Sequence, residues 1–206
     1  MLKDTIEAYN EQAADYEERW SSYLEHTHTK FLDNIESTEH ALLLDVSGGT
    51  GLLAEEILDR EIPYLKFVVD DPSEGMIDIA KSRLPEGQAI AYTNFRADRL
   101  AFDKNSYDRL FCLNAFHHYK NQQQTLDIFY HILKPGGRLY LLDWDRSGFF
   151  VYVNKLIDWL TPEYIDTRSL EEMEDMLEKS CFSITKQESW RWRYWKFFFT
   201  EAQKPL

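Results

Sequence analysis

Short apolar runs alternate with amphipathic segments along most of the chain. Five runs have the length and apolar content of buried strands, at 41–46, 65–70, 89–95, 107–114 and 138–144. Between them, apolar residues recur at helical spacing, as in Met76, Ile79 and Ala80. Two more strands are expected near 182–190 and 194–203, paired as a hairpin. This pattern predicts an α/β fold, with a mostly parallel seven-stranded sheet, helices on both faces and a C-terminal antiparallel hairpin.

Local signals mark where several helices begin and end. An N-terminal helix is expected over 4–20, and another through 150–157. The sequence Pro-Gly-Gly at 135–137 stops the helix that follows the fourth strand. Ser169 and Glu172 have the three-residue spacing of a capping box, which predicts a helix start.

Length and charge narrow the classes of protein to consider. The chain has 206 residues and is expected to form a single domain over 1–206. Its net charge of −13 disfavours nucleic acid and anionic membranes as partners, and fits neutral or cationic small molecules better. No segment is apolar enough for membrane insertion or for a signal peptide, so a cytoplasmic protein is expected. A homodimer is left open.

The cysteines and a pair of histidines give no sign of a metal site. Cys112 and Cys181 lie among apolar residues and are expected to be buried, reduced thiols. His26 and His28 have no cysteine or acidic cluster nearby, so both are interpreted as surface residues. No metal is expected.

A turn rich in small residues joins the first strand to the next helix. Ser47, Gly49 and Gly51 occupy alternate positions there, where small residues let the backbone approach a ligand and helix N–H groups attract an anion. Asp71 follows twenty residues after Gly51 and ends the second strand, a place where an acid accepts hydrogen bonds from ribose hydroxyls. Leu52 stands where a dinucleotide fingerprint has its third glycine. The turn therefore predicts a nucleotide-type cofactor, but not the standard dinucleotide site.

Four segments in this order decide which cofactor is expected: LLLDVSGGTG, VVDDPSEGMIDIAKSRL, RADRLAFDKNSYDRLFCLNAFHH and LKPGGRLYLLD. Together they resemble the class I S-adenosylmethionine (SAM)-dependent methyltransferases, especially the type 11 small-molecule enzymes that include those of quinone biosynthesis. The resemblance implies a Rossmann-like fold. It divides the chain into an N-terminal lid helix region at 1–30, a cofactor-binding core at 41–145, and substrate-side helices with the C-terminal hairpin at 146–206.

The resemblance implies roles for the residues that bind SAM. Asp45 would orient the methionine part through its ammonium group, and Asp71 would hold the ribose hydroxyls. Asn114 would border the ammonium and the transferred methyl group. The backbone of the turn would approach the methionine part, and other residues would cover the adenine or close over the cofactor. These further contacts are assigned to Ser47, Gly48, Gly49 and Gly51 in the turn, to Met76, Ala97 and Asp98 at the adenine, and to Tyr16 and Arg19 in the lid.

The expected reaction is transfer of the SAM methyl group, by in-line displacement, to a small, neutral or ring-containing molecule. His117, His118 and Asp143 are the candidates for a catalytic base, which a phenol or alcohol acceptor would need. A packed histidine pair without a catalytic role is the alternative. Two other functions stay open: a non-catalytic SAM-binding protein, and a nicotinamide-dependent oxidoreductase, which Leu52 disfavours.

Ser47 is the departure from the glycine pattern that matters most. A serine with positive φ would cost about 1–2 kcal/mol of backbone strain. A negative φ is therefore expected, with the hydroxyl group free to bond the cofactor's carboxylate.

Overall fold

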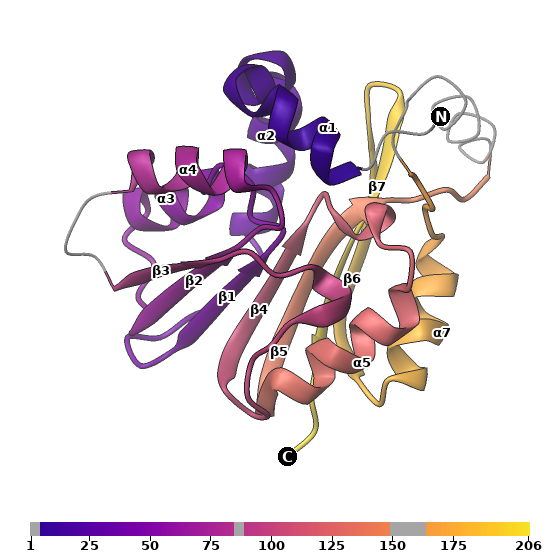
Figure 1. The fold of residues 1–206 in the computed structure, drawn as a ribbon. Helices are drawn as coiled ribbons and strands as arrows, with labels where there is room; N and C mark the ends of the chain where they lie inside the picture. The colour runs from indigo at the N-terminus through magenta and orange to yellow at the C-terminus, as the bar shows by residue number, and fades with distance from the viewer. Residues whose placement is uncertain (1–4, 85–88, 149–163) are drawn as a thin grey trace.

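The computed structural model describes residues 5–84, 89–148 and 164–206, and shows one sheet with helices on both faces (Figure 1). The seven strands lie in the order β3-β2-β1-β4-β5-β7-β6. Strand β7 runs in the opposite direction to the other six strands of this sheet, and it pairs with both β5 and β6. The strands are β1 (Leu42–Val46), β2 (Lys66–Asp70), β3 (Ile90–Thr93), β4 (Tyr107–Leu113), β5 (Leu133–Trp144), β6 (Ser183–Trp192) and β7 (Trp195–Gln203). The predicted fold class is confirmed.

Two apolar layers hold the helices against the sheet, because successive strand residues point to opposite faces. On one face Leu44 and Leu110 pack against α5 (Gln122–Ile132) and α7 (Leu170–Lys179). On the other face Leu43 and Phe111 pack against α2 (Tyr16–Leu32), α3 (Leu52–Asp59) and α4 (Glu74–Arg83). The central strands are thus buried on both sides, which explains their continuous apolar runs. None of the described helices is long and apolar enough to cross a membrane.

The N-terminal helix is longer than predicted and is broken. Helix α1 (Thr5–Gln12) is followed by a short 3-10 turn, η1 (Ala13–Asp15), and then by α2. In Figure 1 α1 lies over the carboxyl ends of the strands, at the top of the view. Its Asn10 accepts hydrogen bonds from the Ser73 hydroxyl group and from the Gly75 N–H at the start of α4. These bonds hold α1 above the strand ends.

The predicted capping box and hairpin are confirmed. The Ser169 hydroxyl accepts from the Glu172 N–H, and the Glu172 carboxylate accepts from the Ser169 N–H. Strands β6 and β7 pair along their length. The strand predicted at 138–144 starts earlier, at Leu133, because Leu133 pairs with Tyr107 across a register shift. The helix predicted through 150–157 lies outside the described residues.

Two predictions about cysteine and histidine are wrong. Cys112 is buried, but Cys181 is exposed. His28 is buried and its Nδ1 lies 2.7 Å from Glu56 Oε2, while the half-buried His26 stacks on Trp192 with ring centroids 4.6 Å apart. Both histidines therefore help to pack α2 against its neighbours.

Candidate active site

A cavity lies at the carboxyl ends of β1, β2 and β4, where strand order reverses and ligands bind in open α/β sheets. It measures about 960 Å³, including space that opens to solvent. Its described lining comes from α1 and from the loops that follow the strands: Thr5, Ile6, Tyr9, Tyr16, Ser47, Gly49, Asp71, Pro72, Ser73, Met76, Arg96, Ala97, Asp98, Leu113, Asn114, Ala115, His118, Tyr119 and Lys120. A second, smaller cavity shares part of this wall and extends toward Asp45, His28 and Thr50.

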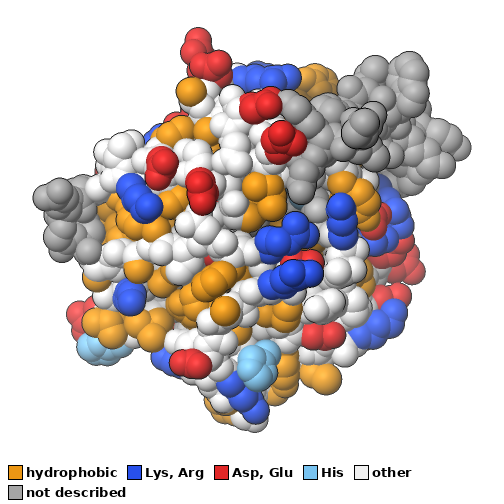
Figure 2. Space-filling view, in the orientation of Figure 1, with side chains coloured by type: hydrophobic (Ala, Val, Ile, Leu, Met, Phe, Trp, Pro, Cys, Tyr) orange, Lys and Arg blue, Asp and Glu red, His pale blue; other side chains and the backbone are white. Residues whose placement is uncertain are grey.

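The charge around this region is uneven. Figure 2 shows Asp and Glu side chains gathered toward the top of the view, with a group of Lys and Arg side chains near its middle. Arg96 and Lys120 line the cavity itself, and Arg96 Nε donates to Asp98 Oδ1 at 3.2 Å. The overall negative charge therefore does not describe the local surroundings of the site.

The glycine-rich turn is shaped for close approach of a ligand. A Cβ at Gly48 would lie 2.6 Å from Asp45 Oδ2 and 2.9 Å from Val69 Cγ1, so this position has room only for glycine. Gly49 has a φ of +56°, and a Cβ there would meet no atom within 4 Å. The predicted backbone approach is thus possible at both residues. Gly51 instead packs against Ala80 of α4 and lines neither cavity.

The prediction for the Ser47 backbone is wrong. Its φ is +59°, in the left-handed region that glycine adopts without strain. Its hydroxyl group is not free either, because Ser47 Oγ lies 2.9 Å from the Tyr119 hydroxyl. Ser47 still lines both cavities.

The Asp71 carboxylate lines the cavity and is fixed by two backbone hydrogen bonds. The Gly49 N–H donates to its Oδ2 at 3.0 Å, and the Ser73 N–H donates to its Oδ1 at 2.8 Å. Burial raises the pKa of Asp71 to about 6, and these two bonds partly oppose that rise. Since a carboxylate offers about four acceptor sites, two are left for a pair of ligand hydroxyls.

Asp45 carries the most unusual polar atom of the site. The residue is 2% exposed, and its Oδ2 has no hydrogen-bond partner among the described residues. Burial, with the nearby Asp71 and Asp70, raises the pKa of Asp45 to about 8. A buried acceptor without a donor costs free energy that a cationic ligand can recover.

Asp70 lies next to these acids but faces away from the cavities. Its Oδ1 accepts from the Thr93 hydroxyl and from the Phe95 N–H, which fixes the loop after β3. It lines neither cavity.

The side expected to hold adenine combines apolar and polar groups. Met76 is 1% exposed, and Ala97 is also buried. Ala97 starts the 3-10 turn η2 (Ala97–Arg99), in which Asp98 also lines the cavity. Met76, Ala97 and Asp98 thus line the same cavity.

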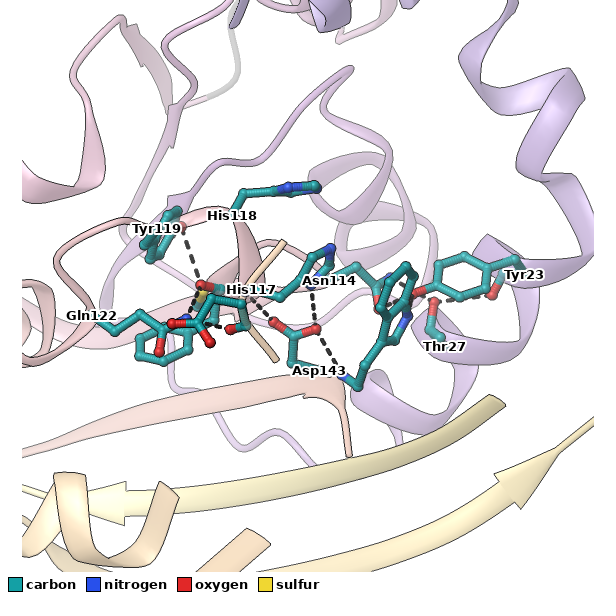
Figure 3. Close-up of polar contacts among 12 residues, drawn as sticks. Tyr23, Thr27, Asn114, His117, His118, Tyr119, Gln122 and Asp143 are labelled. Atoms are coloured by element: carbon teal, nitrogen blue, oxygen red, sulfur yellow. Dashed lines mark hydrogen bonds and ion pairs between the residues drawn. The ribbon is translucent and has the colours of Figure 1, made fainter. Parts of the chain in front are cut away.

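Asn114, directly after β4, forms hydrogen bonds with two side chains of α2. Its Oδ1 accepts from the Tyr23 hydroxyl at 2.9 Å, and its Nδ2 donates to Thr27 Oγ1 at 2.8 Å. Figure 3 shows Asn114 beside these two side chains of α2. Its φ of +57° turns the chain away from β4, and the residue lines both cavities.

Of the two lid residues predicted to bind SAM, Tyr16 lines the cavities and Arg19 does not. Tyr16 lines both cavities, and Tyr9 of α1 joins it at the larger one. Arg19 is exposed, lines neither cavity and bonds Gln12 at 3.4 Å. Arg19 therefore does not join Tyr16 in the walls of the cavities.

His117 and Asp143, two of the three candidates for a catalytic base, form a buried pair with each other. His117 Nδ1 lies 2.6 Å from Asp143 Oδ1, and the His117 N–H donates to Oδ2 at 2.8 Å. Trp144 stacks on His117 with centroids 4.4 Å apart. Figure 3 shows His117 directed at Asp143, and neither residue lines a cavity.

His118 does line the cavity, and its hydrogen bonds define its protonation. Nδ1 lies 2.9 Å from the carbonyl oxygen of Tyr164, which can only accept, so Nδ1 carries the proton. Nε2 lies 2.9 Å from the Tyr9 hydroxyl and accepts from it. Burial and the neighbouring His117 lower the pKa of His118 to about 3. The ring is neutral at pH 7.

We therefore expect His118 not to titrate between pH 5 and pH 8. A lowered histidine pKa means that the folded state favours the neutral ring, so stability is retained above pH 6.5 and is lost as the pH falls toward 3. The ring resonances of His118, identified in NMR spectra by their loss in His118→Gln, should not shift over this range. A midpoint near 6.5 would contradict the assignment and restore His118 as an ordinary base.

The residues present fit SAM, the expected cofactor. Asp71 offers acceptors for a ribose, and Met76 with Ala97 offers an apolar slot. The unpartnered Asp45 Oδ2 offers a site for an ammonium group beside Gly48, where a side chain has no room. No group of three or more His, Cys, Asp or Glu side chains among the described residues could hold a metal ion.

Sequence reasoning missed several residues of the site. Tyr119, Tyr23 and Thr27 act through Ser47 or Asn114, and no local pattern marks them. The contact of Asn10 with the start of α4 could have been suspected, since Asn10 lies beside Tyr9 in α1, within the predicted lid region.

Comparison with known proteins gives a consistent family. Residues 44–141 match a family model described as a methyltransferase domain. A demethylmenaquinone methyltransferase of Symbiobacterium thermophilum is 30% identical over 173 residues, covering 77% of this chain and 66% of the relative. A ubiquinone/menaquinone biosynthesis C-methyltransferase of Hydrogenovibrio crunogenus is 29% identical over 108 residues, covering 51% of this chain and 42% of the relative. The chain thus spans less than half of that relative.

A solved structure supports the fold. A chain from the complex between the Haloferax volcanii Trm112 methyltransferase activator and a methyltransferase matches with a TM-score of 0.83 and 18% identity. The match covers 96% of this chain and 98% of the other. At this identity the likeness concerns the fold alone.

Proposed function

The chain belongs to the class I SAM-dependent methyltransferases of the type 11 family, and from this premise we propose that it transfers a methyl group from SAM to a small molecule. The observation that carries the proposal is the buried Asp45 Oδ2 beside the glycine-rich turn, an oxygen with no hydrogen-bond partner in the described part of the chain. When bound, SAM supplies a methyl group on a sulfonium centre that is already an activated leaving group. Asp45 and Asp71 would hold it, with Met76 and Ala97 against its adenine.

The protein's contribution would be alignment and exclusion of water. Holding the reacting atoms about 3–3.5 Å apart, in line, supplies a large share of the rate of such a displacement. Tyr9 and Tyr16 close the cavity from the lid side, and Asn114 is fixed by two hydrogen bonds from α2. His118 would hold the Tyr9 hydroxyl at the cavity through Nε2, and its pKa of about 3 makes it a poor base for a phenol or alcohol.

The acceptor is proposed to be small, neutral or ring-containing. The lining of the cavity includes apolar and aromatic side chains, among them Ile6, Tyr9 and Leu113. Rings and hydrocarbon chains pack well on such a wall. The relatives named above have quinone-related methyl acceptors in their names, which agrees with this class.

Ligand binding provides the direct test. Thermal shift is measured with SAM, S-adenosylhomocysteine (SAH) and NAD, and methyl incorporation is then followed over a panel of phenols, quinols and amines. We expect stabilisation by SAM and SAH but not by NAD, and turnover with at least one ring-containing acceptor. Stabilisation by NAD alone would refute the proposal, and binding without turnover on the whole panel would favour a non-catalytic SAM-binding protein.

A further inference from the structure

Ser47 and Tyr119 make a contact between two loops that bound the cavity. Ser47 follows β1, and Tyr119 follows η3 (Phe116–His118), beyond the end of β4. Their hydroxyl oxygens lie 2.9 Å apart, and both residues line the cavity. The bond therefore links the glycine-rich turn to the neighbouring loop across 72 residues of sequence.

The contact has a backbone cost to offset. Ser47 has a φ of +59°, and a non-glycine residue in this region is strained. The Gly48 N–H donates to the Asp70 carbonyl at 2.9 Å, so the conformation of Ser47 sets how the turn meets β2. Removing the hydroxyl group while keeping a Cβ would leave the strain without the bond that opposes it.

The hydrogen bond between the Ser47 and Tyr119 hydroxyl groups leaves one of their two protons available for another hydrogen bond. Together they have two O–H donors, and their mutual bond uses one of them. The remaining donor faces either the cavity or Cys112 Sγ, which lies 3.6 Å from the Tyr119 oxygen and is a weak acceptor. The pair can thus offer one hydrogen bond to a ligand without giving up its own.

We propose that Tyr119 is a positioning residue for the cofactor, which holds Ser47 in its left-handed conformation and so keeps the glycine-rich turn in the form that binds SAM. This inference rests on the proposed function. It also explains why a serine is tolerated where glycine would be free of strain: the loop after β4 supplies the tyrosine that opposes the strain.

The test is a double-mutant cycle read by calorimetric titration with SAH. Tyr119→Phe should weaken SAH binding about fivefold, as loss of one hydrogen bond implies. Ser47→Ala should weaken it at least as much, because the strain stays and the bond is lost. Ser47→Gly should cost less than about threefold. In the Ser47→Gly background, Tyr119→Phe should then have an effect within about twofold.

A matched control removes a tyrosine hydroxyl elsewhere. The Tyr64 hydroxyl is buried without a hydrogen-bond partner among the described residues, so Tyr64→Phe should leave SAH affinity unchanged. If Tyr119→Phe weakens binding equally with serine or glycine at position 47, the two residues act independently and the proposal is overturned. Equal losses for Ser47→Ala and Ser47→Gly would also overturn it.

Urea unfolding without ligand separates this inference from the proposed function. Ser47→Ala and Tyr119→Phe should each lower the urea midpoint, and Tyr119→Phe should lower it less when residue 47 is glycine. If the wild-type protein does not bind SAH, the proposed function fails, while the urea cycle still decides whether Tyr119 holds Ser47. Equal midpoint losses in both backgrounds would refute that contact.

Discussion

Asp45→Asn is expected to weaken SAH binding about 10- to 100-fold, as loss of a hydrogen bond to a charged group implies, and at the same time to stabilise the protein at alkaline pH. Asp45 is buried and its Oδ2 has no partner among the described residues, so its charge destabilises the ligand-free fold. The same charge would hold the ammonium group of the ligand. The two effects therefore have opposite signs, which ordinary loss of folding cannot imitate.

The pH dependence of the stability gain follows from the raised pKa of Asp45, about 8 in the fold. Between pH 4 and pH 8 the unfolded chain has released this proton while the folded chain keeps it, so wild-type stability falls as the pH rises. The asparagine variant lacks this loss. We expect its advantage in urea unfolding to be at least about 1 kcal/mol larger at pH 8.5 than at pH 5.

Asp70→Asn is the matched control. Asp70 is also fully buried, with an unpartnered Oδ2 among the described residues and a pKa raised by burial to about 7, but it lines neither cavity. Its asparagine variant keeps an oxygen for Thr93 and Phe95, so it should gain stability at alkaline pH without losing SAH affinity. If both variants lost affinity equally, the effect would come from the general field of the acids, and the assignment of Asp45 would be wrong.

The strands and the acids of the site could be predicted because their signals are local. A strand buried on both faces is a continuous apolar run, and a ligand-binding acid in this fold directly follows such a run. Asp71 was predicted in this way, and Asp45 through the resemblance of its segment to the methyltransferases. Arg19 was expected at the cofactor but lines neither cavity, and the direction of its side chain depends on the rotation of α2 about its own axis. That rotation is set after the 3-10 turn at Ala13–Asp15, and two alanines in a helix-forming sequence give no warning of a break.

The parts that could not be predicted depend on contacts between distant residues. Ser47, with its positive φ, forms a hydrogen bond with Tyr119. The side chain of Asn114 is held by hydrogen bonds with Tyr23 and Thr27. The contact of His117 with Asp143, which lies on the next strand 26 residues away, has no local signal either. Local sequence predicts which residue types gather at the strand ends, but tertiary hydrogen bonds decide which of them face the cavity.

Gly48→Ala is expected to cost more binding than any other single methyl group added to the turn. The new Cβ would lie 2.6 Å from Asp45 Oδ2 and 2.9 Å from Val69 Cγ1, closer than real Cβ contacts allow. Val69 lies in the core, so the turn must move instead and carry the Gly48 N–H away from the Asp70 carbonyl. Overpacking of this kind costs about 1–3 kcal/mol of stability. SAH affinity should fall at least about 100-fold, because Asp45 and the turn lose their alignment together.

Gly49→Ala supplies the contrast within the same turn. A Cβ at Gly49 meets no atom within 4 Å, so its cost is the backbone strain of an alanine at a φ of +56°, about 1–2 kcal/mol. We expect the two variants to lose similar stability in urea, and Gly48→Ala to lose at least about tenfold more SAH affinity. Equal affinity losses would show that backbone strain in the turn, and not its close packing on Asp45, controls the binding of the cofactor. The close packing of Gly48 on Asp45 and Val69 would then have no special role in binding, because the clashes with these two side chains are what distinguish the two substitutions.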